Sequence, residues 1–353
     1  MGLLFHNLSA EYTLVADKVF KRQFDEDPRL LEEYDSERKK RMYQDILHNL
    51  SFLKMSLELN DERLFTDYSK WLLKLMIHLM PDLGEARIKA QMIHHYTLLK
   101  DTLESSLPKR SFHQVRLLLD NAIALSETYE SDQEPSRLEG KYAHIKATYF
   151  RFLKERNAKK AIQYIKSLYE QGLPLEDIYV DILQEVMTEV GELWQRKEIE
   201  VDEEHYMTAI TQTVLVQFYD KIFSSEPNGK TAIACSVGSE LHEMGSRMIS
   251  DLLAFHGYDT THLGAGIPKK AILKRLIQEP ADYLLLSVTM PQHLLECKAI
   301  VESVKAQIPG IKIAVGGRAF TMTDKLYSKW PIDFYAEDAK RLISQLEDDR
   351  HDR

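Results

Sequence analysis

Over the first 129 residues, apolar side chains recur with the period of an α-helix. The clearest run has spacings of four, four, three and four residues: Met42, Ile46, Leu50, Leu53 and Leu57. Such spacing places all five on one face of a helix. Asn60 and Asp61 follow as capping residues for the next helix, and strand-like alternation is absent. We therefore predict an all-helical domain over residues 1–129.

Two polar stretches divide the rest of the chain. Residues 129–140 and 224–230 gather Ser, Asp, Glu, Pro, Asn and Gly, which is the composition of linkers. Between them the helical period returns in four segments: Tyr142–Leu153, Lys159–Tyr169, Leu175–Trp194 and Asp202–Phe223. Residues 137–223 are therefore predicted to form a compact four-helix bundle.

Residues 230–349 show a different period. Short β-branched or apolar runs alternate there with helical patterns, and the five runs are TAIACSV, YDTTHLG, YLLLSVT, IKIAVGG and IDFYA. Strands that alternate with helices form βαβ units, so we expect a flavodoxin-like, doubly wound parallel sheet of five strands. Ligands of such sheets bind beyond the carboxyl ends of the strands.

Composition narrows the class of protein. The chain has 353 residues, a formal net charge of −9 and no dense Lys/Arg tract, so direct nucleic-acid binding is not expected. Its two cysteines, Cys235 and Cys297, are too few for a disulfide framework, and a reducing cytoplasm fits best. No apolar run reaches the roughly 18 residues of a membrane helix. We expect a cytoplasmic protein without a membrane partner.

His242 lies just past the end of the first predicted strand, in the hexapeptide Glu240-Leu-His242-Glu-Met-Gly245. A glutamate two residues before a histidine can hydrogen-bond the ring nitrogen that does not bind a metal, as carboxylates commonly do beside metal-bound histidines. Gly245 would leave room for a bulky group against the following helix. The alternative is a solvated helix start, and the hexapeptide alone favours that alternative.

Two further motifs change this balance. Forty-one residues separate Gly245 from Ser287, which ends the third strand in Ser-Val-Thr, and twenty-five separate Met290 from Gly316 in the pair Gly-Gly after the fourth strand. All of these motifs fall on one edge of the predicted sheet. Together they resemble the signature of the cobalamin-binding domain, with Glu240 at the position where aspartate is common.

This resemblance implies a role for each matching residue. His242 would ligate cobalt from below, in place of the cofactor's own dimethylbenzimidazole base. Ser287 would hydrogen-bond that base, with Thr289 nearby. Gly316 and Gly317 would let the backbone approach the nucleotide tail closely. Imidazole is a good cobalt ligand, and no thiolate is needed.

The predicted bundle carries a second motif. Trp194, then nine residues, then Glu204 and His205 resemble the Trp-x9-Glu-His motif of the CarH/LitR family of adenosylcobalamin-dependent photoreceptors. The resemblance implies that Trp194 packs beside the adenosyl ligand, while Glu204 and His205 lie above the corrin ring. The alternative is a core tryptophan and an ordinary helix start. One position departs from the family, because Gln195 stands where a second, cobalt-capturing histidine is expected.

The resemblance covers about Lys141–Leu346, and residues 1–129 stand where the family has its DNA-binding domain. It implies a sensory protein, not an enzyme, in which light cleaves the Co–C bond of adenosylcobalamin and alters signalling through a homo-oligomer or a partner protein. The alternative is a corrinoid methyl carrier that works with a separate methyltransferase. Access to the upper face of the ring separates the two hypotheses.

The helical domain at the front has two candidate ligand residues. His78 and His95 each fall on an otherwise apolar helical face, near Trp71, Met92 and Tyr96. Satisfied core or interface histidines would account for them. A bilin as a second chromophore is the other interpretation, and a dimerisation or partner-docking module would also explain the helices.

Overall fold

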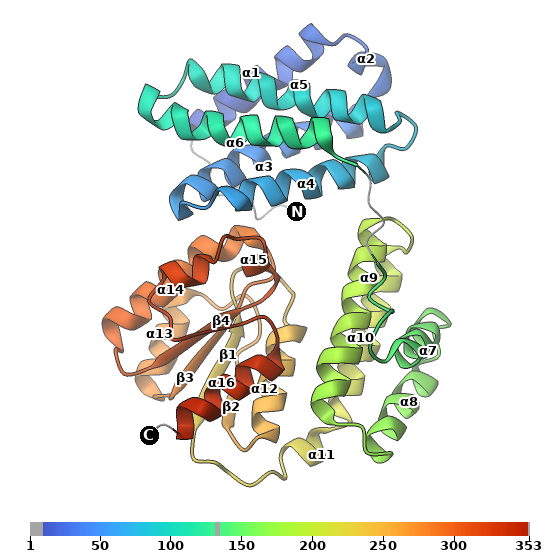
Figure 1. Cartoon of the computed structure of the whole chain (residues 1–353), viewed down its shortest axis with the longest axis vertical. Coiled ribbons are helices and arrows are strands. Elements are labelled where there is room, and N and C mark those ends of the chain that lie inside the picture. The colour runs from blue at the N-terminus through green and yellow to red at the C-terminus, as the bar shows by residue number, and fades with distance from the viewer. Residues whose placement is uncertain (1–9, 131–134, 352–353) are drawn as a thin grey trace. The chain divides into compact units, whose positions relative to one another are not determined.

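The computed structural model describes residues 10–130 and 135–351 (Figure 1). The chain divides into two compact units. One comprises Met1–Asp132 with Met322–Asp324, and the other comprises Gln133–Thr321 with Lys325–Arg353. No helix in the described ranges is both long and apolar enough to cross a membrane.

The first unit is all-helical, as predicted. Its helices are α1 (Ala10–Glu26), α2 (Leu30–Glu33), α3 (Ser36–Leu59), α4 (Glu62–Leu79), α5 (Glu85–Glu104) and α6 (Lys109–Thr128). The predicted stripe on α3 faces the core, since Met42, Ile46, Leu50 and Leu53 are buried. Asp61 caps α4 by accepting a hydrogen bond from the Leu64 amide, at 3.2 Å. Asn60 instead ends α3 in the left-handed conformation, with φ of 52°.

Both candidate histidines of this unit, His78 and His95, have hydrogen-bond partners in the protein. His95 is buried, and its Nε2 lies 3.2 Å from the side-chain amide nitrogen of Asn49. His78 places Nδ1 2.7 Å from the Lys74 carbonyl, one turn earlier on α4. The interpretation of satisfied histidines is therefore confirmed. Burial lowers the pKa of His95 to about 4, so its ring is neutral near pH 7.

The second unit begins with the predicted bundle. It comprises α7 (Ala143–Lys154), α8 (Ala158–Glu170), the π-helical η1 (Asp177–Gln184) that continues into α9 (Glu185–Gln195), α10 (Val201–Val216) and the short α11 (Tyr219–Ile222). The unbroken helix expected over Asp202–Phe223 is wrong. At the end of α10 the hydrogen bonds join residues three apart, as from the Phe218 amide to the Leu215 carbonyl. The buried Phe218 ring then packs on Tyr169 and Tyr179, which fixes the turn into α11.

The sheet has the predicted topology. Its strands are β1 (Thr231–Ser236), β2 (Asp259–His262), β3 (Tyr283–Ser287), β4 (Lys312–Gly316) and β5 (Phe334–Ala336). All neighbours pair in parallel, in the order β2-β1-β3-β4-β5, which is the flavodoxin-like order. The connecting elements are α12 (Met244–Phe255), α13 (Lys269–Gln278), η2 (Pro291–His293), α14 (Leu294–Gln307), α15 (Arg318–Thr321), η3 (Leu326–Lys329) and α16 (Ala339–His351).

Helices cover both faces of the sheet (Figure 1). Alternate strand residues such as Ala232, Ala234 and Leu285 pack with buried residues of α12 and α16, whereas α13 and α14 lie on the opposite face. The same apolar core continues from the α12 and α16 face into the bundle. Bundle and sheet therefore share one core, and this continuity fixes the bundle against the α12 and α16 side of the sheet domain.

An ionic bridge joins the bundle to two sheet helices. His256, which follows α12, lies 2.9 Å from Glu176 at the start of η1 and 3.0 Å from Glu347 on α16. These carboxylates, Glu176 foremost, raise the pKa of His256 above its ordinary value. Its charged form therefore stabilises the fold fully below the unfolded pKa of about 6.5, and this stabilisation is lost as pH rises through the higher folded pKa.

We expect His256→Gln to cost more stability at pH 6 than at pH 9. At pH 6 the substitution removes a positive charge that interacts with the two carboxylates. At pH 9 the ring is neutral, so there is no such charge to remove. Urea unfolding of both proteins at the two pH values measures the difference, and His144→Gln on the exposed side of α7 is the control. An equal loss at both pH values would contradict the bridge.

Candidate functional site

The predicted motifs meet at one edge of the sheet. The strand register aligns Ser236 of β1 with Ser287 of β3, Ser287 with Gly316 of β4, and Gly316 with Ala336 of β5. The Val237 amide donates a hydrogen bond to the Ser287 carbonyl, at 2.9 Å. The loop that carries His242 therefore leaves the sheet beside the other two motifs, as the spacing predicted.

Glu240 ties that loop to the next one. Its carboxylate accepts hydrogen bonds from the backbone amides of Thr289 and Met290, each at 2.9 Å, and its side chain is only 3% exposed. The same carboxylate lies 3.3 Å from Nδ1 of His242. A carboxylate only accepts hydrogen bonds, so Nδ1 carries a proton, and in the neutral ring Nε2 keeps its lone pair. This tautomer is the one required for metal ligation through Nε2.

His242 is open to its surroundings, unlike Glu240. Its side chain is 59% exposed, and it lies in the loop just before α12. The hydrogen bond with Glu240 raises the pKa of His242, and the charge of Glu204 adds to this effect while Arg318 opposes it. Glu204 belongs to the bundle, so its field reaches the histidine at the sheet edge.

A buried polar network holds the His242 loop from beneath. Ser236 donates to the His242 carbonyl at 2.9 Å, and its hydroxyl lies 2.9 Å from that of Ser246 on α12. The Ser246 hydroxyl also lies 2.9 Å from Nε2 of His262, at the end of β2. These three residues were not predicted from the sequence. Their only signal was a serine or histidine at the carboxyl end of an apolar strand, or on the inner face of a helix.

The glycines of the motifs have different structural reasons. A Cβ on Gly317, whose φ is +98°, would lie 2.4 Å from the Val288 carbonyl, and one on Gly316 would lie 2.7 Å from the Ala336 carbonyl. Both positions are therefore constrained by neighbouring backbone as well as by any ligand. Gly245 differs, because a Cβ there would meet nothing within 4 Å. It opens the space beside His242.

The bundle motif lies at the facing ends of α9 and α10. Trp194, in the last turn of α9, is 50% exposed. Glu204 and His205 lie in the first turn of α10; Glu204 contacts Nδ1 of His205 and accepts from the Thr208 hydroxyl at 2.8 Å. The His205 side chain is 74% exposed. Trp194 is therefore not a core residue, and its large apolar surface is available to a ligand.

These residues fit a corrinoid. His242 offers one exposed nitrogen in a fixed tautomer, which suits a single axial bond to cobalt. Gly245 leaves the adjacent space clear for the ring. Within residues 10–130 and 135–351, no group of three or more His, Cys, Asp or Glu residues could hold a metal ion by itself.

Glu240→Gln should weaken cobalamin binding about tenfold, the lower end of the range for groups that orient a metal-bound histidine. The amide has a single acceptor oxygen, so one of the two loop amides loses its partner. Its NH₂ group would also favour the tautomer with the proton on Nε2, which blocks the ligating nitrogen. Equilibrium titration followed by absorbance measures the change. Glu243→Gln, which removes the same charge three residues on, should bind normally; an equal loss there would contradict the tautomer mechanism.

Gly245→Ala should have opposite effects on stability and on binding. The cofactor-free protein should gain roughly 0.5–1 kcal/mol, because alanine is the better helix former and its Cβ meets no atom. Cobalamin affinity should fall, because the methyl group enters the space beside His242. Urea unfolding and cobalamin titration of the same preparation test both. A variant that binds as tightly as the wild type would show that the ring does not approach α12.

Comparison with known proteins identifies related domains on both sides of this site. A profile described as a B12 binding domain matches residues 230–343, the sheet domain. A second profile, also described as a B12 binding domain, matches residues 148–217, the bundle. The two matched ranges lie within the predicted sheet domain, residues 230–349, and the predicted bundle, residues 137–223.

Curated relatives are distant. The chain is 28% identical over 89 residues to the glutamate mutase sigma subunit of Clostridium cochlearium, covering 25% of this chain and 65% of that subunit, which is less than two thirds of its length. It is 24% identical over 183 residues to dimethylamine corrinoid protein 3 of Methanosarcina acetivorans, covering 50% of this chain and 83% of that protein.

One solved structure has a similar fold. It is that of the Methanosarcina barkeri monomethylamine corrinoid protein, with a TM-score of 0.50 and 18% sequence identity. The similarity covers 56% of this chain and 94% of that protein. Bundle and sheet thus occur together in a protein named for a corrinoid.

Proposed function

We propose that His242 ligates the cobalt of a cobalamin held between the bundle and the sheet domain, which match two profiles that are each described as a B12 binding domain. The observation that carries the proposal is the Glu240 carboxylate, which fixes the His242 tautomer and is itself held by two backbone amides. Ser287 and Gly316 would border the nucleotide tail of the cofactor, and Trp194 and Glu204 would lie on the upper side of its ring.

We propose corrinoid-dependent methyl transfer as the first use of this site. Its support is the pair of corrinoid proteins above, which resemble both the cap and the sheet domain. Bound cobalamin would supply a cobalt–carbon bond that can transfer a methyl group or be cleaved by light. The role of the chain would be to hold the ring by His242 and to leave its upper face accessible to a separate methyltransferase.

A sensory function is the second candidate, and the cap residues favour it. Trp194 presents half of its surface at the end of α9, and the carboxylate of Glu204 is oriented by Thr208 and His205. An aromatic surface beside an oriented acceptor suits an adenosyl group, with its flat base and ribose hydroxyls. The loss of such a ligand in light would then shift the equilibrium of the cap or of an assembly.

One experiment separates the two uses. The full chain is loaded in the dark with adenosylcobalamin or with methylcobalamin, and its absorbance and gel-filtration volume are recorded before and after green light. A light-dependent change of spectrum and elution volume with the adenosyl form alone supports the sensor. An unchanged elution volume, together with methyl transfer from the methyl form to a thiol acceptor, supports the carrier.

Trp194→Ala sharpens this test. Removal of the indole should weaken the binding of adenosylcobalamin and leave that of methylcobalamin unchanged, because a methyl ligand would be too small to contact the indole. Equal affinity of wild type and variant for both cobalamins would contradict a cap that recognises the upper ligand. If the wild type binds neither form, the cobalamin proposal itself fails.

A further inference from the structure

The helical unit of residues 10–130 contains a cavity of about 90 Å³ between α1, α3, α4 and α5. Most of its wall is apolar and includes four methionines: Met42, Met76, Met80 and Met92. Methionine side chains adapt to irregular small ligands. The volume is far below the roughly 300 Å³ at which sites for drug-sized ligands begin, so the cavity gives no support to a bilin. It has room for about three groups the size of water.

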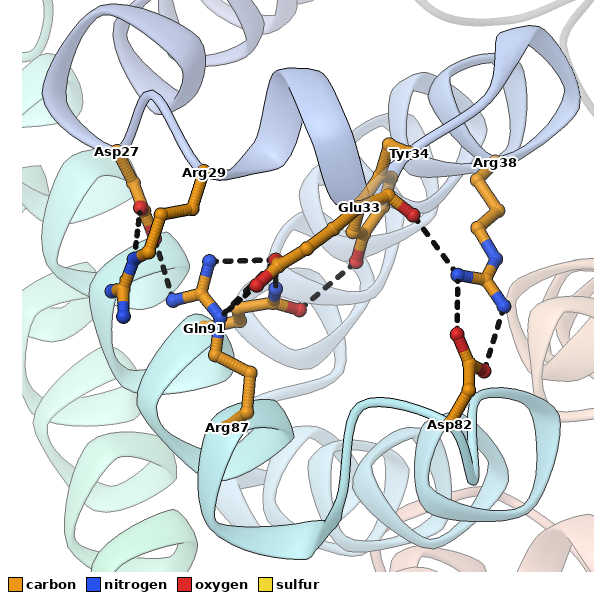
Figure 2. Close-up of polar contacts among 8 residues, drawn as sticks. All are labelled: Asp27, Arg29, Glu33, Tyr34, Arg38, Asp82, Arg87 and Gln91. Atoms are coloured by element: carbon orange, nitrogen blue, oxygen red, sulfur yellow. Dashed lines mark hydrogen bonds and ion pairs between the residues drawn. The ribbon is translucent and has the colours of Figure 1, made fainter.

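The rim of the cavity is a paired polar network (Figure 2). Tyr34 donates to the Gln91 side-chain oxygen at 3.0 Å, and the Gln91 amide donates to Glu33 at 2.8 Å. Arg87 bridges Glu33 and Asp27, at 2.7 Å and 2.6 Å. The network joins the start of α5 to the segment around α2, and it holds Tyr34 and Gln91 in place as parts of the cavity wall.

The cationic groups at the cavity also have carboxylate partners. Arg38 makes two hydrogen bonds to Asp82, at 2.9 Å and 2.8 Å, and a third to the Glu33 carbonyl. Figure 2 shows this guanidinium reaching from α3 to Asp82, which lies in the turn between α4 and α5. Arg41 pairs with Glu37 at 3.3 Å. The positive charges of the wall are therefore already neutralised.

Two of the remaining polar residues of the wall, Asn49 and Gln23, each have a buried side-chain oxygen without a partner in the described part of the chain. Asn49 is fully buried, and its amide nitrogen donates to the Asp45 carbonyl at 2.7 Å and lies 3.2 Å from His95 Nε2. Its oxygen has no partner among the described residues, nor has the side-chain oxygen of Gln23, a residue that is 4% exposed. Each buried acceptor left alone costs about 1–3 kcal/mol.

Asp45 adds a carboxyl group to the same wall. Over residues 10–130 and 135–351, no hydrogen bond or ion pair reaches its carboxylate, although its backbone carbonyl is bonded to Asn49. Burial raises the pKa of Asp45 to about 7, and the positive charge of Arg41, one turn earlier on α3, opposes this shift. A cationic donor beside this carboxylate would offset its cost of desolvation.

We propose that this cavity binds a small primary ammonium compound with a short alkyl chain. An ammonium group has three N–H donors and no acceptor, and it meets three acceptors here: the Gln23 oxygen, the Asn49 oxygen and the Asp45 carboxylate. The alkyl chain packs against the methionines. This inference is independent of the corrinoid site, because every residue it uses lies in the helical unit.

Ligand-observed NMR titration of the full chain with n-propylammonium tests the proposal, with n-propanol and propionate as isosteric probes. A ligand of about four heavy atoms reaches a Kd of tens of micromolar at best, so concentrations up to tens of millimolar are needed. We expect saturable binding of n-propylammonium, at least tenfold stronger than that of n-propanol, and no binding of propionate.

Two variants locate the site. Asp45→Asn should weaken n-propylammonium binding at least tenfold, whereas Asp25→Asn, on the exposed surface of α1, should leave it unchanged. Gln23→Leu provides a second, uncharged test, with a smaller loss expected. Far-UV circular dichroism and the affinity for cobalamin establish that each variant is folded. Absent binding to the wild type, undiminished binding to a folded Asp45→Asn, or preferential binding of propionate would each overturn the proposal.

Discussion

His242→Ala is expected to lower the affinity of the protein for cobalamin about 100-fold or more. Removal of a group that merely orients a metal-bound histidine costs 10–100-fold, and loss of the ligand itself should cost at least the upper figure, which corresponds to about 2.7 kcal/mol. The alanine would also leave the buried Glu240 carboxylate with only its two amide donors. The bound cofactor should then show the spectrum of cobalt without a histidine ligand.

Equilibrium titration with hydroxocobalamin, followed by absorbance, measures both the affinity and the ligation state. His144→Ala, an exposed histidine on α7, is the matched control and should bind as the wild type does. Addition of imidazole gives a rescue experiment, because the free base can occupy the space that the side chain vacates. A variant that keeps both the affinity and the spectrum of the wild type would exclude His242 as the cobalt ligand.

Gly317→Ala is expected to destabilise the second unit by about 3 kcal/mol. The residue has φ of +98°, and the new Cβ would lie 2.4 Å from the carbonyl oxygen and 2.8 Å from the amide nitrogen of Val288. Neither contact involves a flexible side chain, so β4 and the loop after β3 would have to separate. The Val288 amide would then lose its hydrogen bond to the Gly316 carbonyl.

Urea unfolding of the cofactor-free chain measures this loss. Gly310→Ala is the control, because a Cβ there meets nothing within 4 Å and its φ lies outside the range that favours glycine. The contrast separates backbone strain from the general effect of replacing glycine. An unchanged midpoint for Gly317→Ala would mean that the loop adapts, and the glycine would then need an explanation based on the ligand alone.

Much of the fold was predictable because the hydrophobic period changes at the same places where polar linkers and turn residues occur. The five β runs, their separating helices and the sheet topology follow from residues 230–349 alone. The C-terminal end of α10 could not be predicted in this way. The helical period continues past Val216, but the packing of Phe218 on Tyr169 and Tyr179 turns the chain. Local pattern carries no information about such a contact.

The residues of the candidate site could be predicted from the sequence, but the hydrogen bonds between them could not. His242, Glu240 and the Gly-Gly pair come from motifs, and strand register brings them together. The sequence does not reveal that Glu240 binds the amides of Thr289 and Met290, because those partners are backbone atoms some fifty residues away. It also does not reveal the cavity near Asn49, which depends on how four helices pack.

The Glu240 carboxylate also has a consequence for the entropy of binding. Because one side chain ties the loop after β1 to the loop after β3, both segments are ordered when the chain folds, before any ligand arrives. These loops therefore lose their conformational entropy when the chain folds and not when the ligand binds. Short loops that are already ordered in this way can hold a large ligand without a further loss of loop entropy.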